Sequence, residues 1–370
     1  MKRTRKKQQP LIILAAGGTG GHVYPAEALA EELEKRGYRL ALITDSRGKD
    51  NYRGKLGEIP NISVWSGALV GKSKWFKLKS LFKTAVGVLQ AGWILWRKKP
   101  VCVVGFGGYA SFPTAMAAIL LGIDLVIHEQ NSVMSRTNRF LSKYASLIAQ
   151  SFRKVKYTPA GVKTVLTGMP VRGAIVEAGQ RSYQGDGEEF CLLVLGGSQG
   201  AKIFSEVVPE AVKSLDPTLR KRLKIVQQCR KDDVELVRKA YDGSDCVCEV
   251  AHFYDNMPTL YANSQLIISR AGASSVSEIA VTGLPSILVP LPTAADDHQS
   301  GNAREIAEAG AGLVIKQKDF TVEKLKNILE ELTANPIKLQ KMSVGARRIG
   351  IADAASRLAD AIEKEIVRKR

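Results

Sequence analysis

Two stretches of this chain share one pattern, and together they constrain the fold more than any other feature. Residues 11–22 read LIILAAGGTGGH, and residues 191–201 read CLLVLGGSQGA. An uninterrupted apolar run is typical of a strand buried on both faces of a parallel sheet. The glycine turn that follows lets the backbone approach a ligand at the start of the next helix. Two such turns, each opening one half of the chain, predict twin nucleotide-binding domains that face each other across a central cleft.

Strand-like and helical patterns alternate along both halves, which predicts βαβ units and parallel sheets. The expected fold class is therefore α/β, with two Rossmann-like domains. We expect an N-terminal domain over residues 10–172 and a C-terminal domain over 173–351, with the polar segment 171–189 as the linker. The amphipathic helix expected at 352–370 is predicted to cross back onto the first domain. Expected strands are 11–15, 40–44, 101–104 and 125–128, then 191–195, 223–227, 246–250, 266–269, 286–290 and 312–315; helices are expected at 25–36 and 112–121.

Composition narrows the possible partners and the compartment. The 370 residues suffice for two domains, and 54 basic against 36 acidic residues give a formal charge of +18, which points to an anionic partner. The basic residues gather in the N-terminal tail and in 72–99 and do not interleave with the glycine-rich segments, so we expect no nucleic-acid partner. Five cysteines, an odd number, are typical of reduced thiols in a cytosolic protein.

Three features have a simpler explanation than the one they first suggest. Cys246-Val-Cys248 with His252 nearby resembles a zinc motif, but its alternation favours a strand. The basic tail and the apolar run after it resemble a secretory signal, yet the run is short and continues into a glycine turn. The longest apolar stretch, 112–127, contains Pro113 and Asp124, so we expect no membrane-spanning segment.

Polar residues follow the expected strands of the first half at their carboxyl ends, where open α/β sheets bind ligands. His22 follows the first glycine turn and is a candidate general base, although it would also suit a helix cap. The segment His128-Glu-Gln-Asn131 ends another strand, and 105–111 forms a further glycine-rich loop beside it.

The second half carries a strand, a small-residue turn and a helix over 267–279. Ser275 and Glu278 fit a capping box. Alternatively, the free N–H groups around 273–276 hold a diphosphate while Glu278 binds a ribose hydroxyl. An NAD-dependent oxidoreductase is the competing hypothesis, with Asp45 as the ribose-binding acid, but the third glycine of its fingerprint would fall on Val23. The chain has no Asp-x-Asp motif, so we expect helix dipoles and basic residues to neutralise a diphosphate without a metal.

These motifs occur in one order from Leu11 onward, and together they resemble the MurG family, the bacterial UDP-N-acetylglucosamine:lipid I N-acetylglucosaminyltransferases of peptidoglycan synthesis. The resemblance implies the GT-B architecture. It also implies transfer of N-acetylglucosamine, with inversion, to the C4 hydroxyl of lipid I, which gives lipid II. A related GT-B transferase with another lipid-linked acceptor is the alternative.

The resemblance further implies site residues, partners and a location. The catalytic residues would be His22 and Glu129, and the acceptor would be contacted by Tyr109 and His128. The donor would be contacted by Thr19, Gly20, Gly21, Asn131, Arg172, Ser198, Tyr254, Ala273, Ser274, Ser275, Val276, Ser277, Glu278, Gln299 and Asn302. No cofactor or metal is expected. The partners would be UDP-N-acetylglucosamine, lipid I, an anionic membrane surface, and cell-wall synthesis and division proteins. The location would be peripheral, on the cytoplasmic face of the inner membrane. Three positions depart from the family pattern: Met169, Tyr254 and His298.

Residues 72–83 combine five lysines with aromatic and leucine side chains. This mixture is typical of a helix lying on an anionic bilayer, with Trp75, Phe76 and Phe82 at the interface and the lysines near headgroups. An ordinary surface helix with solvated lysines is the alternative.

Overall fold

The computed structural model describes residues 9–17, 20–45, 52, 54–67, 74–185, 187–197 and 200–369. Two compact units make up the chain: unit 1 holds Met1–Arg172 with Asp353–Arg370, and unit 2 holds Gly173–Ala352. The predicted donor contacts Thr19 and Ser198, and the first lysine of the basic segment, Lys72, lie outside the described residues.

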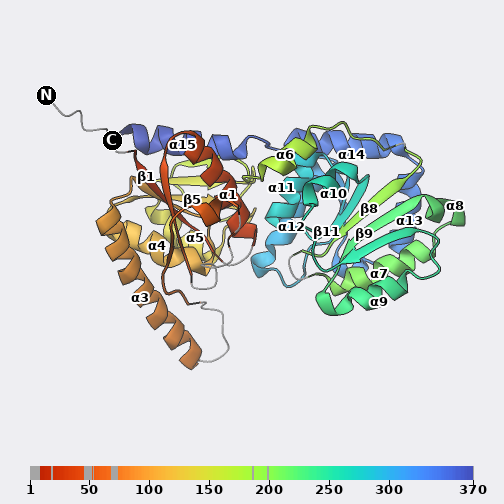
Figure 1. The fold of residues 1–370 in the computed structure, drawn as a ribbon, viewed down its shortest axis with the longest axis horizontal. Helices are drawn as coiled ribbons and strands as arrows, with labels where there is room; N and C mark the ends of the chain where they lie inside the picture. The colour runs from red at the N-terminus through yellow and green to blue at the C-terminus, as the bar shows by residue number, and fades with distance from the viewer. Residues whose placement is uncertain are drawn as a thin grey trace. The chain divides into compact units, whose positions relative to one another are not determined.

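Unit 1 is built on one parallel sheet, in which Figure 1 labels β1 and β5. Its described strands follow the order β3-β2-β1-β4-β5-β6-β7. The strands are β1 (Leu11–Ala15), β2 (Arg39–Thr44), β3 (Asn61–Ser63), β4 (Cys102–Gly105), β5 (Asp124–Glu129), β6 (Leu147–Gln150) and β7 (Thr164–Leu166). The helices are α1 (Gly20–Lys35), α2 (Lys55–Glu58), α3 (Lys74–Lys98), α4 (Gly108–Leu120), α5 (Arg136–Leu141) and α15 (Ala354–Glu365), with short 3₁₀ turns at Ser142–Tyr144 and Val367–Lys369.

The central strands of unit 1 are apolar throughout because helices cover both faces of the sheet. Every residue of β1 is buried, and its side chains alternate between two hydrophobic clusters. Ile12 and Leu14 pack with α1 and α15, whereas Ile13 packs on the α3 and α4 side. This double burial explains why the strand sequence lacks the apolar–polar alternation of a half-exposed strand.

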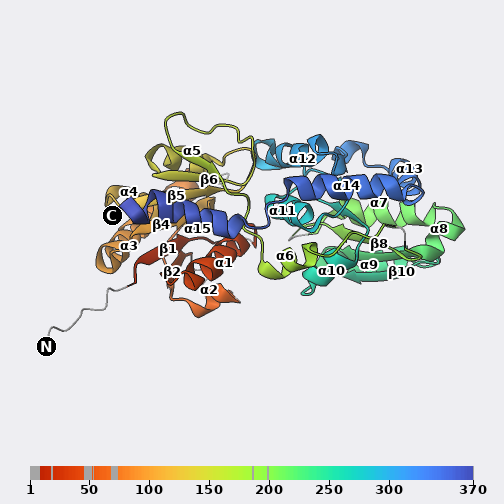
Figure 2. The ribbon, with the colours of Figure 1, turned by 90° about the horizontal axis from the view of Figure 1, so that it is seen from above.

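Helix α15 completes unit 1 although it comes from the far end of the chain. It lies beside α1, and both views of the ribbon show the pair together (Figure 2). Leu358 and Ile362 are buried in the cluster beneath the two helices. Arg36, just after α1, donates hydrogen bonds to Asp360 at 2.6 Å and to Ser356 Oγ at 2.8 Å. The last helix is therefore part of the core of unit 1.

Unit 2 repeats the design, with a parallel sheet in the order β10-β9-β8-β11-β12-β13 among the described strands. The strands are β8 (Phe190–Leu195), β9 (Leu223–Gln228), β10 (Val247–Ala251), β11 (Leu266–Ser269), β12 (Ser286–Leu288) and β13 (Gly312–Val314). The helices are α6 (Gly173–Gly179), α7 (Lys202–Lys213), α8 (Pro217–Arg222), α9 (Val234–Ala240), α10 (Met257–Asn263), α11 (Ala273–Thr282), α12 (His298–Glu308), α13 (Val322–Thr333) and α14 (Pro336–Ile349), with 3₁₀ turns at Lys231–Asp233, Ala295–Asp297 and Gln317–Asp319.

The predicted class, two Rossmann-like α/β domains with parallel sheets, is confirmed. Several local predictions are wrong. The helix expected at 112–121 begins four residues earlier, because α4 starts at Gly108. Helix α1 begins at Gly20 and not at Pro25, so Pro25 lies inside the helix. Part of the expected linker forms α6, which packs on α10 and α11. The capping box does not form, because α11 already begins at Ala273 and its N-cap is Gly272.

Candidate active site

In unit 1, the candidate residues gather where the strand order changes direction, between β1 and β4. Chains that leave two such strands diverge, and the space between them is the usual ligand site of this sheet type. His22 lies near the start of α1, directly after β1. The turn after β4 reaches it through Gly107 and Gly108, which both have positive φ, at 81° and 75°. A Cβ on Gly108 would lie 3.3 Å from His22 Nε2, so glycine permits this close approach.

The environment of His22 keeps its imidazole neutral. Burial lowers its pKa from the ordinary value of 6.5, and polar contacts with the Phe106 backbone and the Gln130 side chain only partly oppose this. Its Nδ1 atom is buried and has no hydrogen-bond partner among the described residues. A neutral imidazole suits a group that accepts a proton.

Glu129, predicted as a catalytic residue, is buried and its carboxylate is occupied. Oε1 accepts a hydrogen bond from Asn131 N at 2.9 Å; Oε2 accepts from Ser135 N at 3.1 Å and from Asn138 Nδ2 at 2.7 Å. Burial raises the pKa of this carboxyl, and these bonds favour the ionised form. The geometry gives Glu129 a positioning role: it fixes the loop between β5 and α5, which carries Gln130 and Asn131.

His128 lies one residue earlier on β5 and faces the protein interior. Its side chain is fully buried, with Nε2 3.1 Å from Gly168 O and its ring 5.6 Å from the Phe106 ring centroid. Burial lowers its pKa to about 4. His128 thus packs close to His22, with which it interacts electrostatically; the acceptor contact predicted for it stays a prediction. Tyr109, the other predicted acceptor residue, is half-buried near the start of α4.

Three residues of unit 1 form a stack at the start of α1. The Arg172 guanidinium lies over the Tyr24 ring, 4.4 Å from its centroid. A Cβ on Gly20 would come within 2.7 Å of that ring, so glycine is needed there. Gly20 and Arg172, both predicted donor contacts, thus meet the same aromatic side chain; Gly21 follows in the helix.

In unit 2, the predicted donor residues 273–278 form the first six positions of α11. Val276 N makes the first intrahelical hydrogen bond, to Gly272 O at 2.9 Å, so the preceding N–H groups point out of the helix end. The N-cap provides no side-chain acceptor for them. Ser274 Oγ is buried and has no partner among the described residues. Such an end is suited to an anionic oxygen.

Gln299 and Asn302, near the start of α12, hold the turn that leads into α11. Gln299 Oε1 accepts hydrogen bonds from Ala271 N at 3.2 Å and Leu291 N at 2.9 Å. Asn302 Nδ2 donates to Ala271 O at 3.1 Å, and its side chain is fully buried. Together they fix both backbone polar groups of Ala271. Both side chains therefore hold this turn, and the donor contacts predicted for them stay predictions.

Arg270 is an organising residue that the sequence reasoning missed. It follows β11 directly and is buried, and it donates to Val289 O at 3.1 Å and to Gln317 Oε1 at 2.7 Å. Its guanidinium also lies 5.2 Å from the Phe204 ring centroid. Arg270 therefore ties the carboxyl ends of β11 and β12 together. The sequence feature that could have indicated this role is an arginine placed directly after an apolar strand.

Two tyrosines surround the remaining donor positions. Tyr261 on α10 donates from its hydroxyl to Glu278 Oε2 at 2.9 Å. Tyr254, predicted as a donor contact, is buried, and its hydroxyl donates to Glu249 O at 3.0 Å. Only the ring of Tyr254 therefore remains for a base. No sequence pattern pointed to Tyr261.

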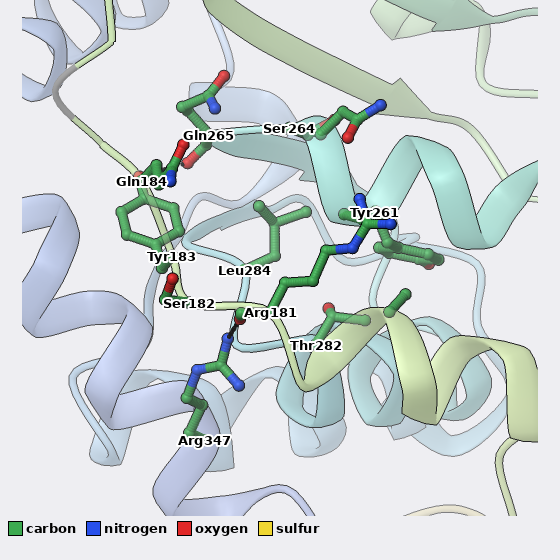
Figure 3. Close-up of a pocket in the computed structure, with 13 residues that line it drawn as sticks. Arg181, Ser182, Tyr183, Gln184, Tyr261, Ser264, Gln265, Thr282, Leu284 and Arg347 are labelled. Carbon is green, nitrogen blue, oxygen red and sulfur yellow. Dashed lines mark hydrogen bonds between the residues drawn. The ribbon is translucent and has the colours of Figure 1, made fainter.

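A separate polar cavity of about 490 Å³ lies at the opposite edge of unit 2, near the amino ends of β11 and β12. Figure 3 shows Arg181 and Arg347 on its walls, with Tyr261 and Thr282 at one side. Arg347 donates to the carbonyl oxygens of Gly179 and Arg181, which fixes the end of α6. Two residues of its wall, Tyr261 and Thr282, donate hydrogen bonds to Glu278 of the candidate donor site.

Two kinds of feature are absent from the part of the chain that the structure describes. The described residues contain no cluster of three or more His, Cys, Asp or Glu side chains with the arrangement of a metal site. They also contain no helix whose length and apolar character would let it span a bilayer.

Comparison with known proteins places the chain in a family. Residues 12–150 match the glycosyltransferase family 28 N-terminal domain, and residues 191–362 match the family 28 C-terminal domain. The chain belongs to glycosyltransferase family 28. This family 28 member is 47% identical to the UDP-N-acetylglucosamine--N-acetylmuramyl-(pentapeptide) pyrophosphoryl-undecaprenol N-acetylglucosamine transferase of Paramagnetospirillum magneticum, over 96% of each chain. The protein of the same name from Rhodospirillum rubrum is 44% identical, over 95% of this chain and 91% of the relative.

A solved structure agrees with these relatives. The crystal structure of Acinetobacter baumannii MurG superimposes with a TM-score of 0.77 at 32% sequence identity, covering 96% of this chain and 99% of that one. The resemblance to the MurG family is thus confirmed.

Proposed function

We propose that this family 28 glycosyltransferase transfers N-acetylglucosamine from UDP-N-acetylglucosamine to the C4 hydroxyl of lipid I, with inversion, and so forms lipid II for peptidoglycan synthesis. The full-length match to relatives that bear the name of this reaction supports the substrate pair. The observation that carries the assignment to this chain is the start of α11, where a helix end without a side-chain cap meets the unsatisfied Ser274 hydroxyl.

Unit 2 binds the donor in this proposal. The N–H groups at the start of α11 receive the diphosphate, Glu278 accepts hydrogen bonds from ribose hydroxyls, and Gln299 Nε2 contacts the sugar. The helix end also stabilises the charge that develops on the departing UDP, and no metal is required for this step.

Unit 1 binds the acceptor and supplies the base. Neutral His22 takes the proton from the C4 hydroxyl while that oxygen attacks the anomeric carbon of the donor. The bond from that carbon to the UDP oxygen breaks on the opposite face, so the configuration inverts. Glu129 acts through the loop that it fixes, and it does not exchange a proton with substrate.

Helix α3 supplies the membrane contact. Its inward face carries mainly small or polar side chains, such as Ser80, Thr84 and Ala91, while Trp75 and Phe82 are 74% and 64% exposed. Lys77, Lys79 and Lys83 are exposed on the same segment. Figure 1 shows α3 along the outside of unit 1. Because burying large aromatic groups and placing lysines near headgroups both favour binding, we assign α3 to the anionic cytoplasmic face of the inner membrane.

The decisive experiment incubates the purified protein with radiolabelled UDP-N-acetylglucosamine and lipid I in detergent micelles. We expect a labelled disaccharide lipid and stoichiometric UDP, with no requirement for added divalent ions and no inhibition by a chelator. A parallel reaction offers a polyprenyl diphosphate sugar that lacks the peptide. Transfer to this second acceptor but not to lipid I would replace the proposed acceptor with another lipid-linked sugar.

A further inference from the structure

Two cysteine side chains on unit 2 lie close together, outside the residues assigned to either substrate. Cys246 Sγ and Cys248 Sγ are 3.1 Å apart, and both residues are half-buried. The other three cysteines, Cys102, Cys191 and Cys229, are buried. The pair therefore combines mutual contact with access from solvent.

The local backbone explains the contact. Asp245 has a positive φ of 58°, so the chain bends just before β10. Cys246 lies in this bend, and the pairing of β10 with β9 begins only at Val247. Strand β10 is at the edge of the sheet. Because Cys246 is outside the ladder, it can move toward Cys248 without breaking a strand hydrogen bond.

The surroundings make the two thiols unequal. The hydrogen bond from Cys248 lowers the pKa of Cys246 to about 7, and the Ser244 hydroxyl, 2.9 Å away, and Arg220 act in the same direction. The thiolate that forms on Cys246, together with burial, raises the pKa of Cys248. One sulfur is thus suited to attack an oxidant, and its neighbour keeps a proton and is placed to react second.

We propose that Cys246 and Cys248 form a peroxide-reactive dithiol that closes to an intramolecular disulfide. The Cys246 thiolate attacks one oxygen of hydrogen peroxide, the O–O bond breaks, hydroxide leaves, and a sulfenic acid forms. The Cys248 sulfur then attacks the Cys246 sulfur, and the sulfenic hydroxyl leaves as water with the Cys248 proton. Both thiols are oxidised and the peroxide is reduced to water. Closure requires the sulfur atoms to approach by about 1 Å, to the usual bond length of roughly 2.0 Å.

The sequence makes the test specific, because trypsin releases residues 240–270 as a fragment whose only cysteines are Cys246 and Cys248. The reduced full-length protein is treated with a small excess of hydrogen peroxide, alkylated and digested with trypsin, and the fragment masses are measured by mass spectrometry. We expect this fragment to lose two hydrogens and to resist alkylation, and we expect dithiothreitol to restore both thiols. A fragment that stays fully alkylated under these conditions would overturn the proposal.

Variants separate the two roles. In Cys248→Ser, dimedone should trap a sulfenic acid on Cys246; in Cys246→Ser, fragment 240–270 should form neither adduct nor disulfide. Cys229→Ser is the matched control and should behave like the wild type. Disulfide-linked dimers in place of the closed fragment, or dimedone labelling of Cys248 in the wild type, would contradict the assignment. The wild-type measurement remains decisive if a variant does not fold.

Discussion

The Tyr261 hydroxyl donates a hydrogen bond to Oε2 of Glu278 at 2.9 Å and so links helix α10 to the donor-site face of helix α11. Tyr261 itself is buried, and its ring also lines the cavity at the far edge of the sheet. The rotamer of Glu278, and with it the placement of the proposed ribose contact, is therefore held by Tyr261.

Tyr261→Phe should weaken donor binding without removing the carboxylate. A hydrogen bond to a charged group contributes about 1.5 kcal/mol, which corresponds to roughly a tenfold rise in the Kd for UDP-N-acetylglucosamine. Calorimetric titration measures the effect, and kcat at saturating donor should change little. Tyr183→Phe is the matched control, because its hydroxyl donates to Gln265 O in the same cavity. Equal loss of affinity in both variants would show a general packing effect.

His22→Ala should lower kcat by about 10²- to 10⁴-fold, the range for loss of a general base, and change donor affinity much less. In the wild type, burial sets the pKa of His22 below 6.5, and the base must be neutral. Activity should therefore be level above that pH and fall only as the pH drops through the lowered pKa. Initial rates from pH 5 to 8 test this. Wild-type turnover in the variant would remove His22 from the role of base.

Glu129→Gln should destabilise unit 1 by about 1–3 kcal/mol. The carboxylate now accepts hydrogen bonds from N–H groups on both of its oxygens, whereas an amide would place an NH₂ donor against one set of these N–H groups. Urea denaturation followed by circular dichroism measures the change. Glu177→Gln, at an exposed position of α6, provides the control and should leave the midpoint unchanged. An unaltered midpoint in Glu129→Gln would mean that the loop between β5 and α5 is held by other contacts.

Stability should depend on pH through His128. Its folded-state pKa, about 4, lies below the unfolded value of 6.5, so the unfolded chain binds the proton first as the pH falls. The free energy of unfolding should be constant above pH 6.5 and decline between pH 6.5 and 4, by about 3 kcal/mol at the lower limit for this one group. His128→Gln should flatten that part of the curve. An unchanged slope would contradict the burial argument.

Replacing Trp75, Phe76 and Phe82 with serine should reduce binding to anionic phospholipid vesicles while leaving UDP binding intact. The control is the triple serine variant of Leu236, Phe253 and Ile337, which are exposed apolar residues of unit 2. Vesicle sedimentation at two salt concentrations separates the apolar contribution from that of the lysines. Equal vesicle affinity in both variants would reject the assignment of α3.

The sequence was most informative where burial dictates composition. Leu11–Ala15 and Leu266–Ser269 are strands with the predicted bounds, because a strand covered on both faces has to be apolar along its whole length. The predicted helix start was wrong where backbone conformation, and not burial, sets the end of an element. Pro25 suggested a helix start, yet α1 begins five residues earlier, where Gly20 packs against Tyr24.

The candidate site was predicted less completely than the fold. Residue type and strand ends were enough to indicate His22 and the start of α11. They do not reveal how deeply a side chain is buried, so they did not indicate that Glu129 and His128 are almost fully buried. Tyr261 and Arg270 act through partners distant in sequence, such as Gln317, and no local pattern marks such pairs.

Helix α15 has a consequence for how the chain is made. Unit 2 is a single continuous segment, whereas the core of unit 1 includes Leu358 and Ile362. During synthesis from the N-terminus, residues 173–352 are therefore all translated before unit 1 has its final helix. Unit 1 therefore keeps part of its apolar surface uncovered until residues 353–370 have been synthesised. Unit 2, which is complete in sequence before that, can fold first.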